Sequence, residues 1–248
     1  MKHIKRQTKI ITTIGPATES EEAIEALIKE GADVFRLNMA HADHAWIKSI
    51  SQRVRKIGNK LNREPAIMMD VKGPEIRTGY LQNEVELKKG DRLDLVFCAQ
   101  PNPPLKDGIW QVEVNYDKLP EHIKSGDTVL LDNGLIPLLV DESSSDIIIC
   151  QVLQDSTLKS RRHVNLPGIE TGLPSLTEKD RRDSMIGIKC EHDFFALSFT
   201  RDADSIDLFR SFLRENGSDA QIIAKIEDQK GVKNIEEIIQ ASDAIMVA

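Results

Sequence analysis

The chain has 248 residues, of which 40% are hydrophobic and 29% are charged, a composition that indicates a globular protein and excludes a disordered, collagen-like or coiled-coil chain. The formal net charge of −7 argues against a nucleic-acid or membrane partner, because such surfaces attract basic proteins. The sequence has no run of 18 apolar residues, no recognisable signal peptide and no CxxC pair among its three cysteines. We therefore expect a cytoplasmic protein without a disulfide framework or a zinc site.

The first seventy residues predict alternating strands and helices. A β-branched run at 8–14 ends in a Gly-Pro pair, which is typical of a strand followed by a turn. Thr18 and Glu21 have the spacing of a capping box and Gly31 stands where a C-cap belongs, so a helix is predicted between them. Two further strands and one amphipathic helix are predicted over residues 32–38, 65–71 and 46–61. This order is typical of parallel βα units.

From about Thr78 to Asn165 the pattern changes to short alternating runs separated by turn residues. Strands are predicted at 85–87, 92–97, 128–131, 135–140 and 146–152. Because no convincing helix is present, residues 78–165 are predicted to form a small antiparallel β domain.

The βα pattern returns after this segment. Thr177 and Asp180 form a second capping box, which predicts a helix at 177–189. Further strands are predicted at 193–200, 220–227 and 244–248, and further helices at 206–215 and 232–240. Residues 1–77 and 166–248 therefore predict an α/β fold with six units of a TIM-type (β/α)8 barrel, two units short of closure.

Three of the predicted barrel strands end in polar residues two positions apart, which places both members of each pair on one face of the sheet. The pairs are Arg36 with Asn38, Asp70 with Lys72, and Lys225 with Glu227. In βα proteins the functional site lies at these carboxyl ends, whereas a structural ion pair that fastens the barrel end is the alternative interpretation. The recurrence at three strand ends favours a site.

The residue types at these ends predict phosphate chemistry. Arg36, Lys72, Arg77 and Lys225 are cations suited to phosphate or carboxylate, and Asp70 and Glu227 offer hard oxygen ligands for Mg²⁺. The sequence has no P-loop and no GxGxxG motif, so a phosphate site would be built from side chains.

Several blocks of the sequence resemble the pyruvate kinase family and occur in its order and spacing. The most specific are KGPEIRTG at 72–79 and IIAKIE at 222–227. Others are TKIITTIGPAT, VFRLNMAH, VNLPG, LPSLTEKD, ALSFTR and SDAIMVA. The resemblance implies a (β/α)8 barrel with an inserted β domain. It also implies glycolytic phosphoryl transfer from phosphoenolpyruvate to ADP with Mg²⁺ (or Mn²⁺) and K⁺, giving pyruvate and ATP, in a homo-oligomer.

The resemblance also implies roles for individual residues. Arg36 corresponds to the arginine that binds the substrate phosphate, Lys225 to the lysine that stabilises charge in the transition state, and Glu227 to a Mg²⁺ ligand. Arg77 and His41 correspond to residues near the nucleotide phosphates.

For K⁺, Asn38 and Asp70 correspond to two ligands, but Ala40 and Val71 stand where the family has a serine and a threonine. K⁺ is therefore a doubtful cofactor.

Two alternatives remain open because the sequence ends before the family's second Mg²⁺ ligand and its last two barrel strands. The chain could bind a phosphorylated or carboxylated metabolite, or pair with a full-length relative, without catalysis. A weaker alternative keeps the metal–enolate chemistry but applies it to a carbon–carbon bond of a pyruvate-like substrate.

Overall fold

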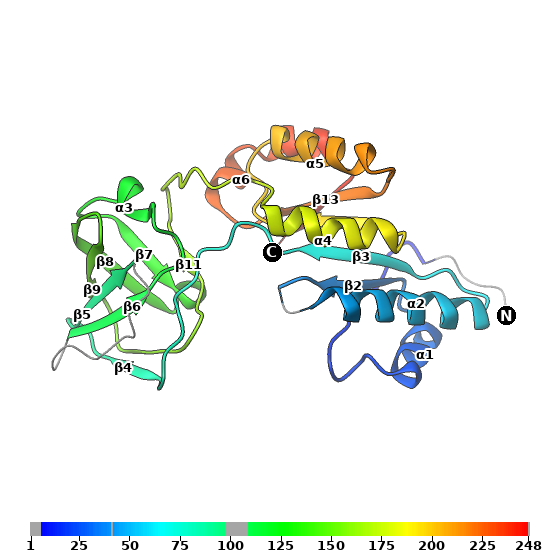
Figure 1. Cartoon of the computed structure of the whole chain (residues 1–248), viewed down its shortest axis with the longest axis horizontal. Helices are drawn as coiled ribbons and strands as arrows, with labels where there is room; N and C mark the ends of the chain where they lie inside the picture. The colour runs from blue at the N-terminus through cyan, green and yellow to red at the C-terminus, as the bar shows by residue number, and fades with distance from the viewer. Residues whose placement is uncertain (1–5, 41, 98–108, 248) are drawn as a thin grey trace. The chain divides into compact units, whose positions relative to one another are not determined.

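The computed structural model describes residues 6–40, 42–97 and 109–247. The chain forms two compact units, shown in Figure 1. We call residues 1–74 with 174–248 the barrel unit and residues 75–173 the β unit.

The barrel unit contains one six-stranded sheet in which every neighbouring pair is parallel, in the order β1-β2-β3-β12-β13-β14. The strands are β1 (Ile11–Thr13), β2 (Val34–Asn38), β3 (Ala66–Val71), β12 (Phe194–Leu197), β13 (Gln221–Ile226) and β14 (Ala244–Val247). This curled parallel sheet confirms the predicted α/β barrel fold with six strands.

The helices of the barrel unit begin and end close to the predicted positions. They are α1 (Glu21–Glu30), α2 (His44–Lys60), α4 (Glu178–Lys189), α5 (Ala203–Glu215), α6 (Gln229–Lys233) and α7 (Ile235–Ala241). The single helix predicted at 232–240 is thus divided into α6 and α7. The capping box of Thr177 and Asp180 is confirmed, and Gly31 is a left-handed C-cap with φ of 99°.

The capping box predicted for Thr18 and Glu21 is wrong. Ser20 is the N-cap of α1, and its side chain accepts a hydrogen bond from the Ala23 N–H. The Thr18 hydroxyl instead accepts from the Gly15 N–H at 3.1 Å, because the Gly-Pro turn brings that amide closer.

The two faces of the barrel sheet bury different clusters. On one face Phe35, Met69 and Leu197 are buried together with helix residues. On the other face Met68 and Ala196 belong to a smaller cluster. Since side chains alternate along a strand, the polar residues that end β2, β3 and β13 extend the second face. The helices therefore cover the face opposite to these polar residues.

The β unit contains a six-stranded sheet in the order β11-β7-β8-β9-β5-β6 and a two-stranded sheet of β10 and β4. Its strands are β4 (Val85–Leu87), β5 (Arg92–Val96), β6 (Ile109–Glu113), β7 (Thr128–Leu131), β8 (Ile136–Ser143), β9 (Ile147–Val152), β10 (Ser156–Leu158) and β11 (Val164–Asn165). All strand pairs are antiparallel except β5 with β6, which is parallel. One α-helical turn, α3 (Leu119–His122), and a 3-10 turn, η1 (Asp132–Gly134), were not predicted.

The β unit has its own hydrophobic core, and this core includes residues beyond the predicted boundary at 165. Leu166, Ile169 and Leu173 pack against the cluster formed by the strands of this unit. The structural unit accordingly runs from Glu75 to Leu173.

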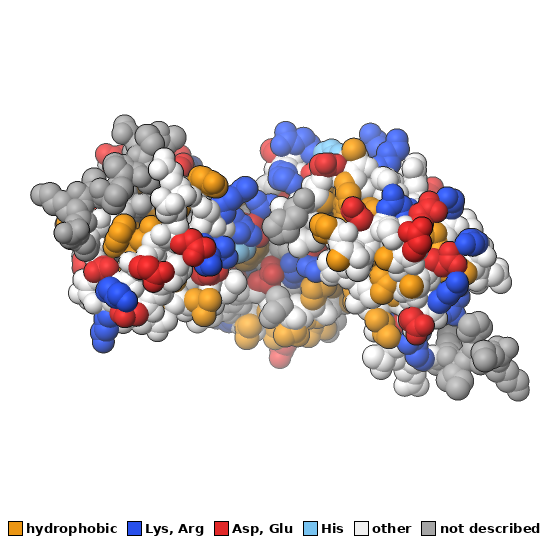
Figure 2. Space-filling view, turned by 90° about the horizontal axis from the view of Figure 1, so that it is seen from below, with side chains coloured by type: hydrophobic (Ala, Val, Ile, Leu, Met, Phe, Trp, Pro, Cys, Tyr) orange, Lys and Arg blue, Asp and Glu red, His pale blue; other side chains and the backbone are white. Residues whose placement is uncertain are grey.

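The surface is charged and mixed in sign. Figure 2 shows acidic and basic side chains interspersed over the visible face of the barrel unit. Within the described part of the chain, every helix is too short or too polar to cross a membrane.

Candidate functional site

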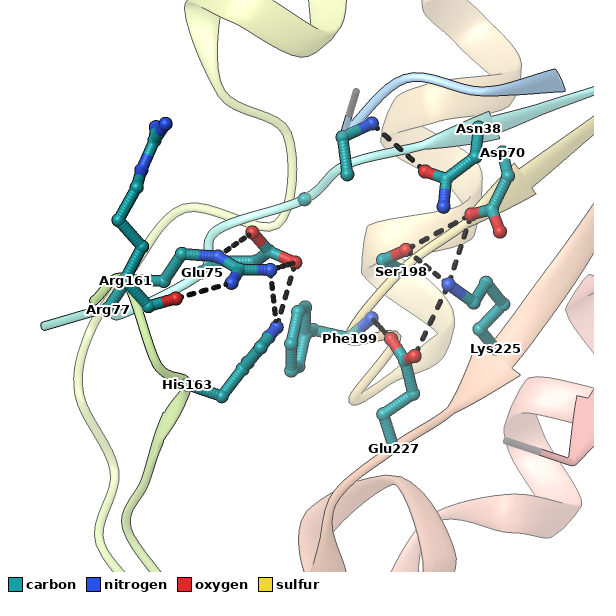
Figure 3. A network of polar contacts seen from close by, with 12 residues as sticks. Asn38, Asp70, Glu75, Arg77, Arg161, His163, Ser198, Phe199, Lys225 and Glu227 are labelled. Carbon is teal, nitrogen blue, oxygen red and sulfur yellow. Dashed lines mark hydrogen bonds and ion pairs between the residues drawn. The ribbon is translucent and has the colours of Figure 1, made fainter. Parts of the chain in front are cut away.

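A network of polar side chains lies at the carboxyl end of the barrel sheet. Strands β2, β3 and β13 each contribute one member, and the residue that directly follows β12 contributes the fourth. The members are Arg36, Asp70, Ser198 and Lys225, and Figure 3 shows Asp70, Ser198 and Lys225 pointing toward one another. The strand ends thus meet as the sequence predicts.

Asp70 connects the two cations of this network. Its side chain is 3% exposed, and one carboxylate oxygen, Oδ2, accepts from both Nε and Nη2 of Arg36, with an Nε–Oδ2 distance of 2.7 Å. The other oxygen, Oδ1, accepts from Nζ of Lys225 at 3.0 Å. A buried carboxylate is tolerated only when it is paired in this way.

The Lys225 ammonium contacts three acceptors, two by hydrogen bonds and one by an ion pair. Besides Asp70, the ammonium contacts the Ser198 hydroxyl oxygen at 2.7 Å and Oε1 of Glu227 at 3.2 Å. Its side chain is 10% exposed. The ion pair that was the alternative interpretation of Lys225 and Glu227 is therefore present in the structure.

Glu227 is held by the segment after β12. Its Oε2 accepts from the Phe199 backbone N–H at 2.8 Å, while Oε1 faces Lys225. Ser198 and Phe199 were not predicted as site residues, because a serine that ends an apolar strand has no distinctive spacing. The available signal was that Ser198 shares the strand face of Ala196.

The K⁺ site that the resemblance implies does not fit the described residues. Oδ1 of Asn38 accepts from the Ala40 N–H at 2.9 Å, and both oxygens of Asp70 are engaged by Arg36 and Lys225. The side chains of Ala40 and Val71 carry no oxygen. Internal donors therefore already satisfy the oxygens that K⁺ would need.

Mg²⁺ fits the site only as an ion shared with a substrate. The described residues contain no group of three or more His, Cys, Asp or Glu side chains that could hold a metal ion. The Glu227 side chain is 19% exposed and offers one carboxylate. Mg²⁺ in kinase sites is held by one or two carboxylates together with substrate phosphates and water, so Glu227 can supply the protein's share.

A second polar cluster lies in the β unit, around Glu75. The carboxylate of Glu75 accepts from Nε of Arg77 at 2.8 Å and from Nη2 at 3.1 Å, and His163 Nε2 is 3.1 Å from Oε1 (Figure 3). Burial alone would raise the pKa of Glu75, but the hydrogen bonds from His163 and Arg77 outweigh it and hold this pKa well below its usual value. The side chain of Arg77 is thus held in place by the carboxylate of Glu75. His41, the other residue expected near the nucleotide phosphates, lies outside the described residues.

Comparison with known proteins identifies the family of the chain. Residues 5–248 match the family description "Pyruvate kinase, barrel domain". The chain belongs to the pyruvate kinase family.

Individual pyruvate kinases are similar to the chain over almost its whole length. The chain is 40% identical over 247 residues to the pyruvate kinase of Staphylococcus saprophyticus, covering 98% of this chain and 41% of that protein. It is 40% identical over 245 residues to that of Clostridium acetobutylicum, covering 98% and 51%. It is 37% identical over 246 residues to plastidial pyruvate kinase 2 of Arabidopsis thaliana, covering 99% and 42%. The chain therefore spans about two fifths to one half of the length of these relatives.

Proposed function

We propose that this chain carries out phosphoryl transfer from phosphoenolpyruvate to ADP, as a glycolytic enzyme of the cytoplasm. The observation that supports the proposal is the network of Arg36, Asp70, Ser198 and Lys225 at the carboxyl end of the sheet, in which three members lie on strands and Ser198 directly follows β12. Such ends bear the active sites of barrel enzymes, and the network holds two cations of the kind that bind phosphate.

In this proposal each side chain has a distinct task. The Arg36 side chain is 26% exposed and binds the substrate phosphate. The Lys225 ammonium stabilises the negative charge that develops on the transferred phosphoryl group and on the enolate. Glu227 would hold Mg²⁺, which would supply charge neutralisation at the phosphate oxygens.

In the structure the carboxylate of Glu227 contacts Lys225, and the same carboxylate would hold Mg²⁺. Mg²⁺ held there would neutralise charge on the substrate phosphate, so phosphoenolpyruvate should bind much more weakly without it. Arg77 is proposed to contact nucleotide phosphate, and a homo-oligomer is proposed from the family.

A coupled assay for ATP formation tests the proposal. With Mg²⁺, phosphoenolpyruvate and ADP, the purified chain should form ATP, and the rate should be the same when K⁺ is replaced by tetramethylammonium. Lys225→Met, which removes the ammonium, should abolish turnover and leave phosphoenolpyruvate affinity nearly unchanged. Absence of ATP at every cation concentration would contradict catalysis by this chain, and saturable binding without turnover would favour the non-catalytic alternative.

A further inference from the structure

The segment that directly follows β12 contacts both charged residues at the end of β13. Ser198 Oγ lies 2.7 Å from the Lys225 ammonium, and the Phe199 N–H donates to Glu227 at 2.8 Å. The Thr200 N–H also donates to the backbone carbonyl of Lys225 at 3.2 Å. Three consecutive residues therefore hold the Lys225–Glu227 pair.

Both acceptors within reach of the Ser198 hydroxyl proton belong to β3. They are the Val71 carbonyl at 2.6 Å and, more distantly, Oδ1 of Asp70 at 3.4 Å, while the hydroxyl oxygen accepts from Lys225. The serine is 3% exposed. Lys225 therefore meets one neutral acceptor, held by β3, and two carboxylates.

The backbone around Ser198 is also constrained. Phe199 has φ of 54°, a left-handed conformation that is uncommon for residues other than glycine. Gly73 approaches so closely that a Cβ built on it would lie 2.9 Å from Cβ of Ser198. Such an arrangement persists only where its surroundings impose it.

We infer that Ser198 is a positioning residue for Lys225. The two carboxylates that contact the ammonium are charged, and each can form an ion pair with another cation in place of Lys225. The Ser198 hydroxyl is neutral and is hydrogen-bonded to the backbone of β3. Ser198 therefore keeps the ammonium in place while Glu227 changes partners. The consequence for catalysis rests on the proposed function, but the contact itself does not.

Hydrogen exchange of the Lys225 Nζ protons, followed by NMR of the full chain, tests the contact without any substrate. Ser198→Ala should speed this exchange about tenfold or more, because the ammonium loses its neutral acceptor. Ser198→Cys, which keeps a side chain of similar shape but accepts hydrogen bonds weakly, should act in the same direction. The matched control is Ser184→Ala, since the hydroxyl of Ser184 is buried and has no hydrogen-bond partner in the described part of the chain.

The control should leave the exchange of the Lys225 protons unchanged. Equal exchange in the parent and in both Ser198 variants would overturn the inference, and thermal unfolding of each variant checks that it is folded. In the coupled assay, Ser198→Ala should lower kcat about tenfold with KM for phosphoenolpyruvate within about threefold. A change confined to KM would also overturn it. If the parent itself forms no ATP, the proposed function fails, and the exchange measurement still decides the role of Ser198.

Discussion

Lys225 is paired with two carboxylates in a nearly buried position, so its removal should affect stability as well as activity. Lys225→Met leaves Glu227 without its cation, and breaking a buried pair in this way costs about 3 kcal/mol of unfolding free energy. The double variant with Glu227→Gln should recover most of this loss, because the uncompensated charge is removed too. Urea unfolding of the two variants measures this, and a double variant no more stable than Lys225→Met would contradict it.

His192 lies outside the proposed site and predicts a pH dependence of stability. Its Nε2 is 2.8 Å from the Ser51 hydroxyl, and Nδ1 has no hydrogen-bond partner within the described residues. Burial, and to a smaller extent the charge of Arg55, lower the pKa of His192 to about 4, while Asp193 acts in the opposite direction. The folded chain therefore holds this imidazole neutral at pH values where the unfolded chain, in which a histidine has its ordinary pKa of 6.5, binds a proton.

The unfolding free energy should accordingly fall as the pH drops from about 6.5 to about 4, by on the order of 3 kcal/mol for this group. His192→Phe keeps an aromatic ring beside Phe195 and removes the titration, so its stability should fall less over this range. Urea unfolding at a series of pH values gives the slope of the unfolding free energy against pH for the parent and for the variant. Identical slopes in the parent and the variant would show that another group causes the acid sensitivity.

At the scale of elements, the start of α4 is tied to the end of β3. Asp180 is fully buried, and its carboxylate accepts from the Thr177 N–H at 2.9 Å, from the Thr177 hydroxyl at 2.6 Å and from the Gly73 N–H at 3.1 Å. The capping box therefore also holds the residue after Lys72, where the chain leaves β3.

Asp180→Ala should cost about 3 kcal/mol of unfolding free energy, because three donors lose their acceptor at a buried site. Ser20→Ala, which removes the exposed N-cap of α1, serves as the comparison and should cost about 1 kcal/mol. Thermal or urea unfolding measures both variants. Equal losses would contradict the larger contribution expected of the buried acceptor.

The elements of the barrel unit could be predicted because each has a local signal, either apolar residues at helical spacing or an apolar run that ends in a turn. Strand β6 of the β unit, whose five residues are IWQVE, was not predicted. Strand geometry was enough to predict that Arg36, Asp70 and Lys225 lie on the same face of the sheet. Their partners were not, because the contact of Asp70 with Lys225 depends on β12 lying between β3 and β13.

At the scale of the whole molecule, each unit has its own core, and the β unit should therefore fold alone. A protein spanning residues 75–173 should unfold cooperatively in urea, with the circular dichroism of a β protein. A protein spanning 78–165 lacks Leu166, Ile169 and Leu173, which pack on that core, and should be less stable by about 2 kcal/mol or more. Equal stability would support the boundaries predicted from the sequence, and an unfolded 75–173 would contradict an independent core.

We expect the network of Arg36, Asp70, Ser198 and Lys225 to bind a substrate and not only to fasten the sheet as an ion-pair cluster. Calorimetric titration of the full chain with phosphoenolpyruvate, with and without Mg²⁺, measures this binding. Binding should be saturable, should require Mg²⁺ and should be lost in Glu227→Gln while the thermal unfolding transition remains. No binding by the parent chain under either condition would contradict it.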